Sequence, residues 1–182
     1  MVQQAWPVVT ARRPDLYPAD LARVCEAYIA DAPRWLDAMN ERPWTFIHGD
    51  YELDNVIFVG EEDAVIVDWQ GCMRSYPGFD LGWTLAASAS PETVERESEL
   101  LDTYRTVLSA SGGPAWSADD LLDDLAVSML YYAASSPVPT MQDYAGMGAQ
   151  GERLVRRFEA FLERCVAAAL RWDVPERVGS LP

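Results

Sequence analysis

The feature that most constrains the fold is a set of three short apolar runs between residues 44 and 70. The runs cover residues 45–47, 56–59 and 64–67, and they are rich in β-branched and aromatic residues. Such runs favour β-strands. Polar residues stand at or near their ends, namely His48, Asp50, Asn55 and Asp68. Strand ends hold side chains in fixed positions, so this stretch predicts a small sheet that carries a polar site at its rim.

The spacing of these polar residues is specific. His48, Asp50 and Asn55 follow the pattern H-x-D-x-x-x-x-N, which is the pattern of the catalytic loop of protein kinases. Asp68 then follows an apolar run, as the metal-binding aspartate of a kinase does. Two such matches in the same order indicate phosphoryl-transfer chemistry more strongly than either match alone.

Three segments together resemble the aminoglycoside phosphotransferase/choline kinase superfamily. They are residues 48–58 (HGDYELDNVIF), 65–70 (VIVDWQ) and 76–82 (YPGFDLG). The Asp-Trp-Gln form at 68–70 is most similar to the ecdysteroid-kinase-like branch. The resemblance covers roughly residues 20–172 and only the C-terminal half of that fold. It implies an α+β fold, the large lobe of a protein-kinase-like enzyme, mainly helical, with a small β-sheet carrying the catalytic loop and the small N-terminal lobe absent.

The resemblance implies an ATP- and Mg²⁺-dependent phosphotransferase that acts on a small-molecule hydroxyl. Asp50 would be the catalytic carboxylate, which orients the acceptor hydroxyl and receives its proton. Asn55 and Asp68 would be ligands of Mg²⁺, which prefers hard oxygen donors. The competing interpretations are ordinary local ones: a turn-capping aspartate, an asparagine in a left-handed turn and an aspartate that caps a strand end.

Four further residues have supporting roles in the same interpretation. His48 is the only histidine, and no nearby set of His or Cys accompanies it as zinc would require, so a role in shaping the loop is favoured. Asp80 is expected to brace the loop, although a simple helix cap is nearly as good an interpretation. Ile57 and Val67 occupy positions that contact adenine in kinases, and ordinary core packing explains them equally well.

The charge of the chain limits its partners. Its 182 residues carry a formal net charge of −15, which disfavours nucleic acids and anionic membranes as partners. No apolar run approaches the roughly 20 residues that cross a bilayer. Cys25, Cys72 and Cys165 form neither a disulfide framework nor a metal-binding cluster in sequence, which predicts reduced thiols in a cytoplasmic protein.

The chain contains no lysine, because all 14 of its basic residues are arginine. In kinases a lysine of the small lobe neutralises the α- and β-phosphates, and only 47 residues precede His48. The expectation is therefore a large lobe whose small lobe is missing or comes from a separate chain. Self-association through the uncovered surface is a further expectation. The alternative function is a truncated or non-catalytic lobe that serves as a binding or regulatory module.

Along the chain, residues 1–18 contain Pro7, Pro14 and Pro18 and are expected to be an irregular lead-in. Residues 19–182 are expected to form the kinase-like lobe. Asp123 and Asp124 are assigned to a solvated acidic face, and 71–78 to a loop. The glycine pattern at 146–151 lacks a preceding strand, so it predicts a joint and not a phosphate site. Helices are predicted over 19–39 (with a break at Pro33), 80–88, 90–109, 117–135 and 150–172.

Overall fold

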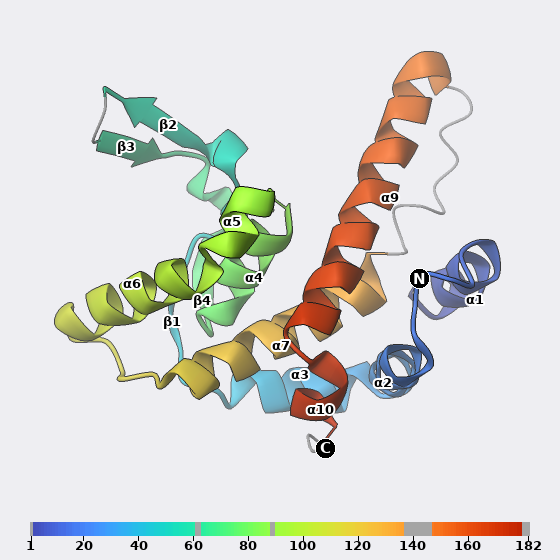
Figure 1. Cartoon of the computed structure of the whole chain (residues 1–182), viewed down its shortest axis with the longest axis horizontal. Helices are drawn as coiled ribbons and strands as arrows, with labels where there is room; N and C mark the ends of the chain where they lie inside the picture. The colour runs from blue at the N-terminus through green and yellow to red at the C-terminus, as the bar shows by residue number, and fades with distance from the viewer. Residues whose placement is uncertain (1, 61–62, 88–89, 137–146, 180–182) are drawn as a thin grey trace. The chain divides into compact units, whose positions relative to one another are not determined.

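The computed structural model describes residues 2–60, 63–87, 90–136 and 147–179. These residues form a mostly helical protein with two short β ladders (Figure 1). The chain divides into two compact units, one made of residues 1–38 and 129–182 and the other of residues 39–128. Within the described residues, helices with the length and apolar character needed to cross a membrane are absent. The α+β composition with a small β content agrees with the sequence prediction.

The first unit opens with helix α1 (Val2–Arg12). The prediction of irregular structure over residues 1–18 is therefore wrong for most of this segment. Pro7 lies inside α1, yet the helix buries Trp6 and Val9, and the Trp6 ring meets the Tyr17 ring edge-on at 4.7 Å between centroids. Burial of such side chains outweighs the cost of a proline in a short helix. The division of the chain into a lead-in over residues 1–18 and a kinase-like lobe over residues 19–182 stays a prediction.

The predicted helix over residues 19–39 forms as two helices, α2 (Ala19–Ala30) and α3 (Ala32–Asn40). The chain leaves helical geometry at Asp31, where φ is −139° and ψ is 53°. This break lies two residues before Pro33, which has no N–H to continue the helical ladder. The predicted interruption near Pro33 is thus confirmed.

The core of the first unit lies between α2, α9 (Gly148–Arg171) and α10 (Val174–Val178). Leu21 and Cys25 of α2, Cys165 of α9 and Val174 of α10 are fully buried. Burial raises the pKa of the Cys25 and Cys165 thiols to about 12, so both behave as small apolar side chains. The three cysteines are free thiols, as predicted.

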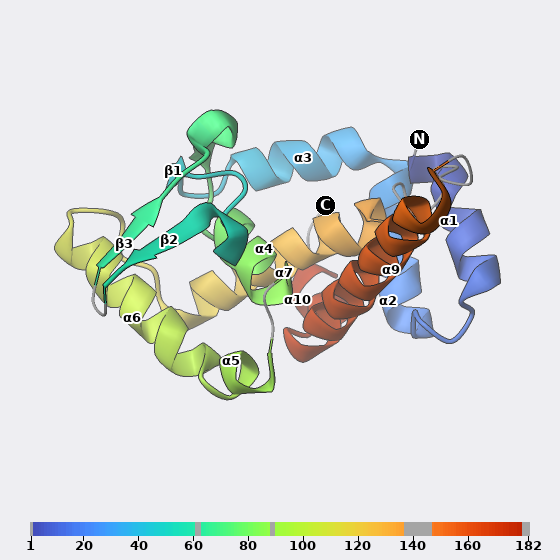
Figure 2. The same cartoon turned by 90° about the horizontal axis from the view of Figure 1, so that it is seen from above.

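The second unit contains two antiparallel ladders in place of the single sheet expected. Strand β2 (Val56–Val59) pairs with β3 (Asp63–Ile66), and both views draw the two strands side by side (Figures 1 and 2). Strand β1 (Thr45–Ile47) pairs with β4 (Met73–Ser75). The prediction of a loop over residues 71–78 is therefore wrong at β4.

The helices of this unit are α4 (Gly78–Ala87), α5 (Pro91–Glu95), α6 (Glu97–Ala110) and the first part of α7 (Ala118–Ser135). The predicted start at Ser90 is confirmed, because its Oγ accepts the N–H of Thr93 at 3.2 Å. The helix predicted over 90–109 forms in two pieces that meet at Arg96. Ser117 and Asp120 cap α7 reciprocally, since each side chain accepts the other residue's N–H.

Asp124 lies inside the second unit. Its side chain is fully buried, and it forms an ion pair with the Arg42 guanidinium. The prediction of a solvated acidic face is therefore wrong for Asp124. The physical reason is helical periodicity, because Asp124 shares a face of α7 with the buried residues Leu121 and Ser128, three and four positions away.

Candidate active site

The candidate site begins where β1 ends, at His48. This side chain is 3% exposed, and its Nε2 lies 2.8 Å from the carbonyl oxygen of Val67. A carbonyl only accepts, so Nε2 carries the hydrogen. The bond ties the segment that leads to Asp50 to the segment that leads to Asp68. This contact supports the loop-shaping role expected for His48.

Asn55 connects the same segments a second time. Its Nδ2 donates to the backbone oxygen of Asp50 at 2.8 Å and lies 3.4 Å from the Asp50 carboxylate. Its own backbone oxygen accepts the N–H of Val67 at 3.0 Å. Asn55 is the last residue of a short 3-10 turn, Leu53–Asn55, directly before β2. These contacts bring Asp50 and Asn55 together and place both beside the residue that precedes Asp68.

Asp68 has a left-handed backbone, with φ 63° and ψ 53°. This conformation is uncommon outside glycine, although aspartate adopts it more readily than most residues. Its carboxylate is exposed and accepts a long hydrogen bond of 3.4 Å from Gln70 Nε2. Backbone outliers of this kind gather at functional sites. The conformation therefore adds a structural argument to the sequence argument for Asp68.

The two loops also touch through their backbones at Gly49 and Gly71. Gly49 has φ 84°, and a Cβ added there would lie 2.2 Å from the carbonyl oxygen of Gly71. Only glycine tolerates both the backbone angle and the close approach. Gly71 was not singled out from the sequence, because its position three residues after Asp68 carries no signal of what it contacts.

Helix α4 holds the loop that follows β1. The two Asp80 carboxylate oxygens accept the N–H groups of His48 at 2.6 Å and Gly49 at 2.8 Å. Thr84, one turn further along α4, hydrogen-bonds the backbone oxygen of Tyr51. The Asp80 contacts support the bracing role and not the helix-cap alternative, because both oxygens bind the loop. Thr84 was not identified from the sequence.

Burial shapes the electrostatics of Asp80. Desolvation raises the pKa of its carboxyl group above the ordinary value, and the N–H donors of His48 and Gly49 oppose that rise. The negative charge of Asp80 is therefore stabilised by the loop itself. Loop geometry and the ionisation of Asp80 depend on each other.

The two residues expected at the adenine ring lie on and beside the β2–β3 hairpin. Ile57 is 52% exposed and pairs with Val65 across the ladder, so ordinary core packing does not explain it. Val67 follows β3 directly and is half-buried, with its N–H and C=O bound to Asn55 and His48. Their contact with a nucleotide base stays a prediction.

The donor groups of this site fit a magnesium ion held in part by phosphate. The Asn55 amide uses its N–H₂ group on Asp50, which leaves its oxygen for a cation, and Asp68 adds an exposed carboxylate. In the described part of the chain no three His, Cys, Asp or Glu residues form a metal cluster. Mg²⁺ fits such a sparse set, because it keeps several waters and binds one or two protein groups plus substrate phosphates.

Comparison with known proteins identifies the family of the chain. No curated protein matches the chain. The model of the phosphotransferase enzyme family matches residues 2–122, which is more than half of the 182 residues and includes every predicted site residue. The match begins before the expected limit of residue 20 and ends before residue 172. The chain therefore belongs to the phosphotransferase enzyme family.

Proposed function

We propose that this protein transfers the γ-phosphate of ATP to a hydroxyl group of a small molecule. The observation that carries the proposal is a set of hydrogen bonds: His48 and Asn55 each bind the backbone of Val67, and Asn55 also binds that of Asp50. They join the Asp50 loop to the segment before Asp68. Phosphoryl transfer demands positioned charges more than covalent chemistry from the protein. These contacts hold together the backbone segments that carry the two carboxylates and the amide, which supports that demand being met.

In this proposal Asp50 accepts the hydrogen bond and then the proton of the acceptor hydroxyl. The Asn55 contact holds the Asp50 backbone, so the carboxylate keeps its orientation while the acceptor binds. Asn55 and Asp68 would hold Mg²⁺, which supplies positive charge against the phosphate oxygens. Ile57 and Val67 would line the site of the adenine ring. His48 and Asp80 position the loop without touching the reacting atoms.

A second candidate is a binding or regulatory module without turnover. One observation favours it: the chain has no lysine to neutralise the phosphates. The β2–β3 hairpin also exposes apolar side chains, with Phe58 70% and Val65 50% accessible. A separate lysine-bearing lobe or a second copy of the chain would cover such a surface. In that case the nucleotide would bind only in the assembled complex.

Calorimetric titration of ATP into the isolated chain, with and without MgCl₂, separates the two candidates. We expect binding that requires Mg²⁺, and an affinity at least about tenfold lower for Asp68→Asn, because the metal loses a charged ligand. Asp37→Asn removes an exposed carboxylate from α3 and should bind ATP as the natural protein does. Failure of the natural chain to bind ATP with Mg²⁺ would reject an autonomous phosphotransferase and favour the second candidate.

A further inference from the structure

A hollow of about 270 Å³ lies at the end of the β1–β4 ladder that is opposite to His48. Thr45 pairs with Ser75 at this end, while Ile47, next to His48, pairs with Met73 at the other. The lining includes Asn40, Arg42, Trp44, Arg74, Ser75 and Tyr76. None of these is a predicted phosphotransfer residue, so the hollow is a distinct place on the second unit.

The charge of this hollow is opposite to that of the whole chain. The chain carries 29 acidic and 14 basic residues, yet the lining has two arginines and no acidic residue. Arg42 is neutralised by Asp124. Arg74 has no ion pair among the residues that the structure describes. Within the described part of the chain, the hollow therefore offers one cation, Arg74, that no carboxylate pairs with.

Trp44 holds this free cation in place. The Arg74 guanidinium carbon lies 4.1 Å from the centre of the Trp44 ring, within the range of a cation–π contact. An arginine over an aromatic face keeps its N–H donors at the edge of the guanidinium plane, where they match a carboxylate or phosphate. The contact thus limits the motion of Arg74 without using its hydrogen-bonding groups.

The remaining lining is mixed, with apolar side chains beside polar ones. Met39 and Tyr76 line the hollow as buried side chains, and Trp44 is 51% exposed. Asn40 and Ser75 contribute short polar groups beside the arginines. Ligand sites commonly combine an apolar lining with a few polar groups, in volumes of roughly 300–1,000 Å³. At about 270 Å³ the hollow lies just below that range, which suits a small molecule.

We propose that this hollow binds a small organic anion. Its oxyanion group, a carboxylate or a phosphate, would pair with the Arg74 guanidinium, and its apolar body would lie against Trp44. The proposal does not depend on phosphotransfer, because it shares no residue with the candidate active site. It predicts a second ligand site at the far end of the strand that leads to Asp50.

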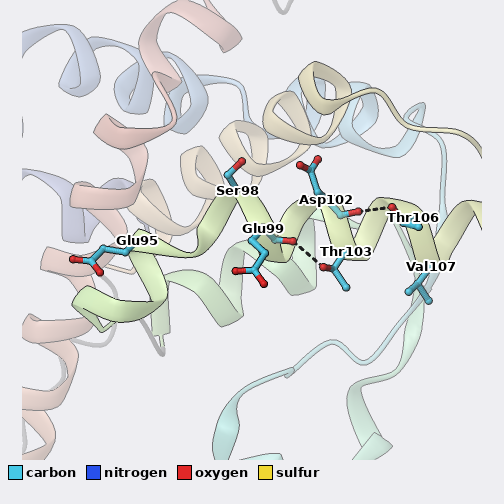
Figure 3. A pocket seen from close by; sticks show the side chains of 7 residues that line it. All are labelled: Glu95, Ser98, Glu99, Asp102, Thr103, Thr106 and Val107. Atoms are coloured by element: carbon cyan, nitrogen blue, oxygen red, sulfur yellow. Dashed lines mark hydrogen bonds between the residues drawn. The ribbon is translucent and has the colours of Figure 1, made fainter.

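A larger hollow of about 680 Å³ along α6 carries no comparable argument. Its lining faces solvent and is acidic, with Glu95, Glu99 and Asp102 among its residues (Figure 3). Thr103 and Thr106 donate to backbone oxygens of their own helix, as the dashed lines in Figure 3 show. This surface is an ordinary polar helix face.

The test is a titration of the full ¹⁵N-labelled chain with benzoate, phenyl phosphate and benzyl alcohol, followed by the indole N–H signal of Trp44. Trp44→Phe identifies that signal. We expect at least one of the two anions to shift it and the neutral alcohol to leave it unchanged. The two anions distinguish a carboxylate site from a phosphate site. A Trp44 signal that neither anion moves, or that benzyl alcohol moves equally, would overturn the proposal.

Arg74→Gln should lower the affinity for the binding anion at least about tenfold, because the charged hydrogen bonds are lost. Arg74→Lys keeps the positive charge but lacks the two-pronged N–H donors of the guanidinium, so it should give an intermediate affinity. If Arg74→Gln misfolds, Arg74→Lys is the variant that tests the role of Arg74. Arg153→Gln removes the same charge from an exposed position of α9 and should bind as the natural protein does. Equal affinity in all three variants would contradict the role of Arg74.

Discussion

The Asp80 carboxylate accepts the backbone N–H of His48 at 2.6 Å, across 32 residues of sequence. Its other oxygen accepts the N–H of Gly49 at 2.8 Å. The start of α4 therefore fixes the backbone that immediately precedes Asp50. Asp80 is half-buried, and under the proposed function it would position the loop without touching substrate.

Replacing Asp80 by asparagine should loosen this segment. Asparagine has one acceptor oxygen, so one of the two loop N–H groups loses its partner, and the new amide group places a donor against a donor. A lost hydrogen bond to a charged group is worth roughly 1.5–3 kcal/mol. We expect the backbone amides of His48 and Gly49 to exchange with deuterium at least about tenfold faster in Asp80→Asn. Unchanged exchange at both amides, with Asp37→Asn as the control, would contradict the bracing role.

Comparing Gly49 with Gly60 separates two reasons why a glycine is needed: a left-handed backbone angle, and close contact with a neighbouring loop. Gly49 and Gly60 have φ of 84° and 74°, but a Cβ at Gly49 would lie 2.2 Å from Gly71 while one at Gly60 meets no atom within 4 Å. Gly60→Ala should lower the free energy of unfolding by about 1 kcal/mol. Gly49→Ala should lower it by about 2 kcal/mol more, because the loops must separate. Urea unfolding measures both, and equal losses would show that the loops do not need this contact.

Asp50→Asn should slow catalysis strongly and preserve nucleotide binding, under the proposed function. General base catalysis contributes about 10²–10⁴-fold to a rate, and the amide keeps the size of the carboxylate and its contact with Asn55. We expect kcat for transfer to any hydroxyl acceptor that the natural protein uses to fall by that factor. The affinity for ATP with Mg²⁺ should stay within a few-fold. A variant that retains most of its turnover would exclude Asp50 as the base.

The site was predictable from sequence where its signal is local, and the missed elements depend on distant contacts. His48, Asp50 and Asn55 lie within eight positions, so their spacing alone made them candidates. Strand β4 was missed because Met-Arg-Ser has little strand character by itself and is stabilised by pairing with β1. Thr84 is an ordinary helical residue until the Tyr51 carbonyl comes near it.

Two predictions, for residues 1–18 and for Asp124, were wrong for a different reason. In each case a local sequence pattern indicated a structure that tertiary packing overrides. Pro7 indicated irregular structure, yet the burial of Trp6 and Val9 keeps α1 helical. Asp123 and Asp124 together suggested a solvated face. The helix turns one of them, Asp124, toward the interior, where Arg42 accompanies it. Composition cannot distinguish one aspartate of such a cluster from another, because only the packing of α7 decides which one is buried.

The Arg42–Asp124 pair should make stability depend on pH in an unusual direction. Burial raises the pKa of Asp124 from 3.8 to about 6, although the charge of Arg42 opposes the rise. Between these values the folded chain holds a proton that the unfolded chain releases, so the free energy of unfolding falls as pH rises from about 4 to about 6. The loss is of order 3 kcal/mol, since one pKa unit corresponds to 1.36 kcal/mol.

Urea unfolding of the natural chain and of Asp124→Asn at pH 4, 5, 6 and 7 tests whether the free energy of unfolding falls as the pH rises. The asparagine cannot ionise, so the stability of the natural chain relative to the variant should decline across that window and level off above it. Asp37→Asn removes an exposed carboxylate and serves as the matched control. If the natural chain instead gains stability relative to Asp124→Asn as pH rises, the attraction of Arg42 outweighs the cost of burial. In that case the ion pair, and not a neutral carboxyl group, stabilises the contact between α7 and Arg42, which precedes β1.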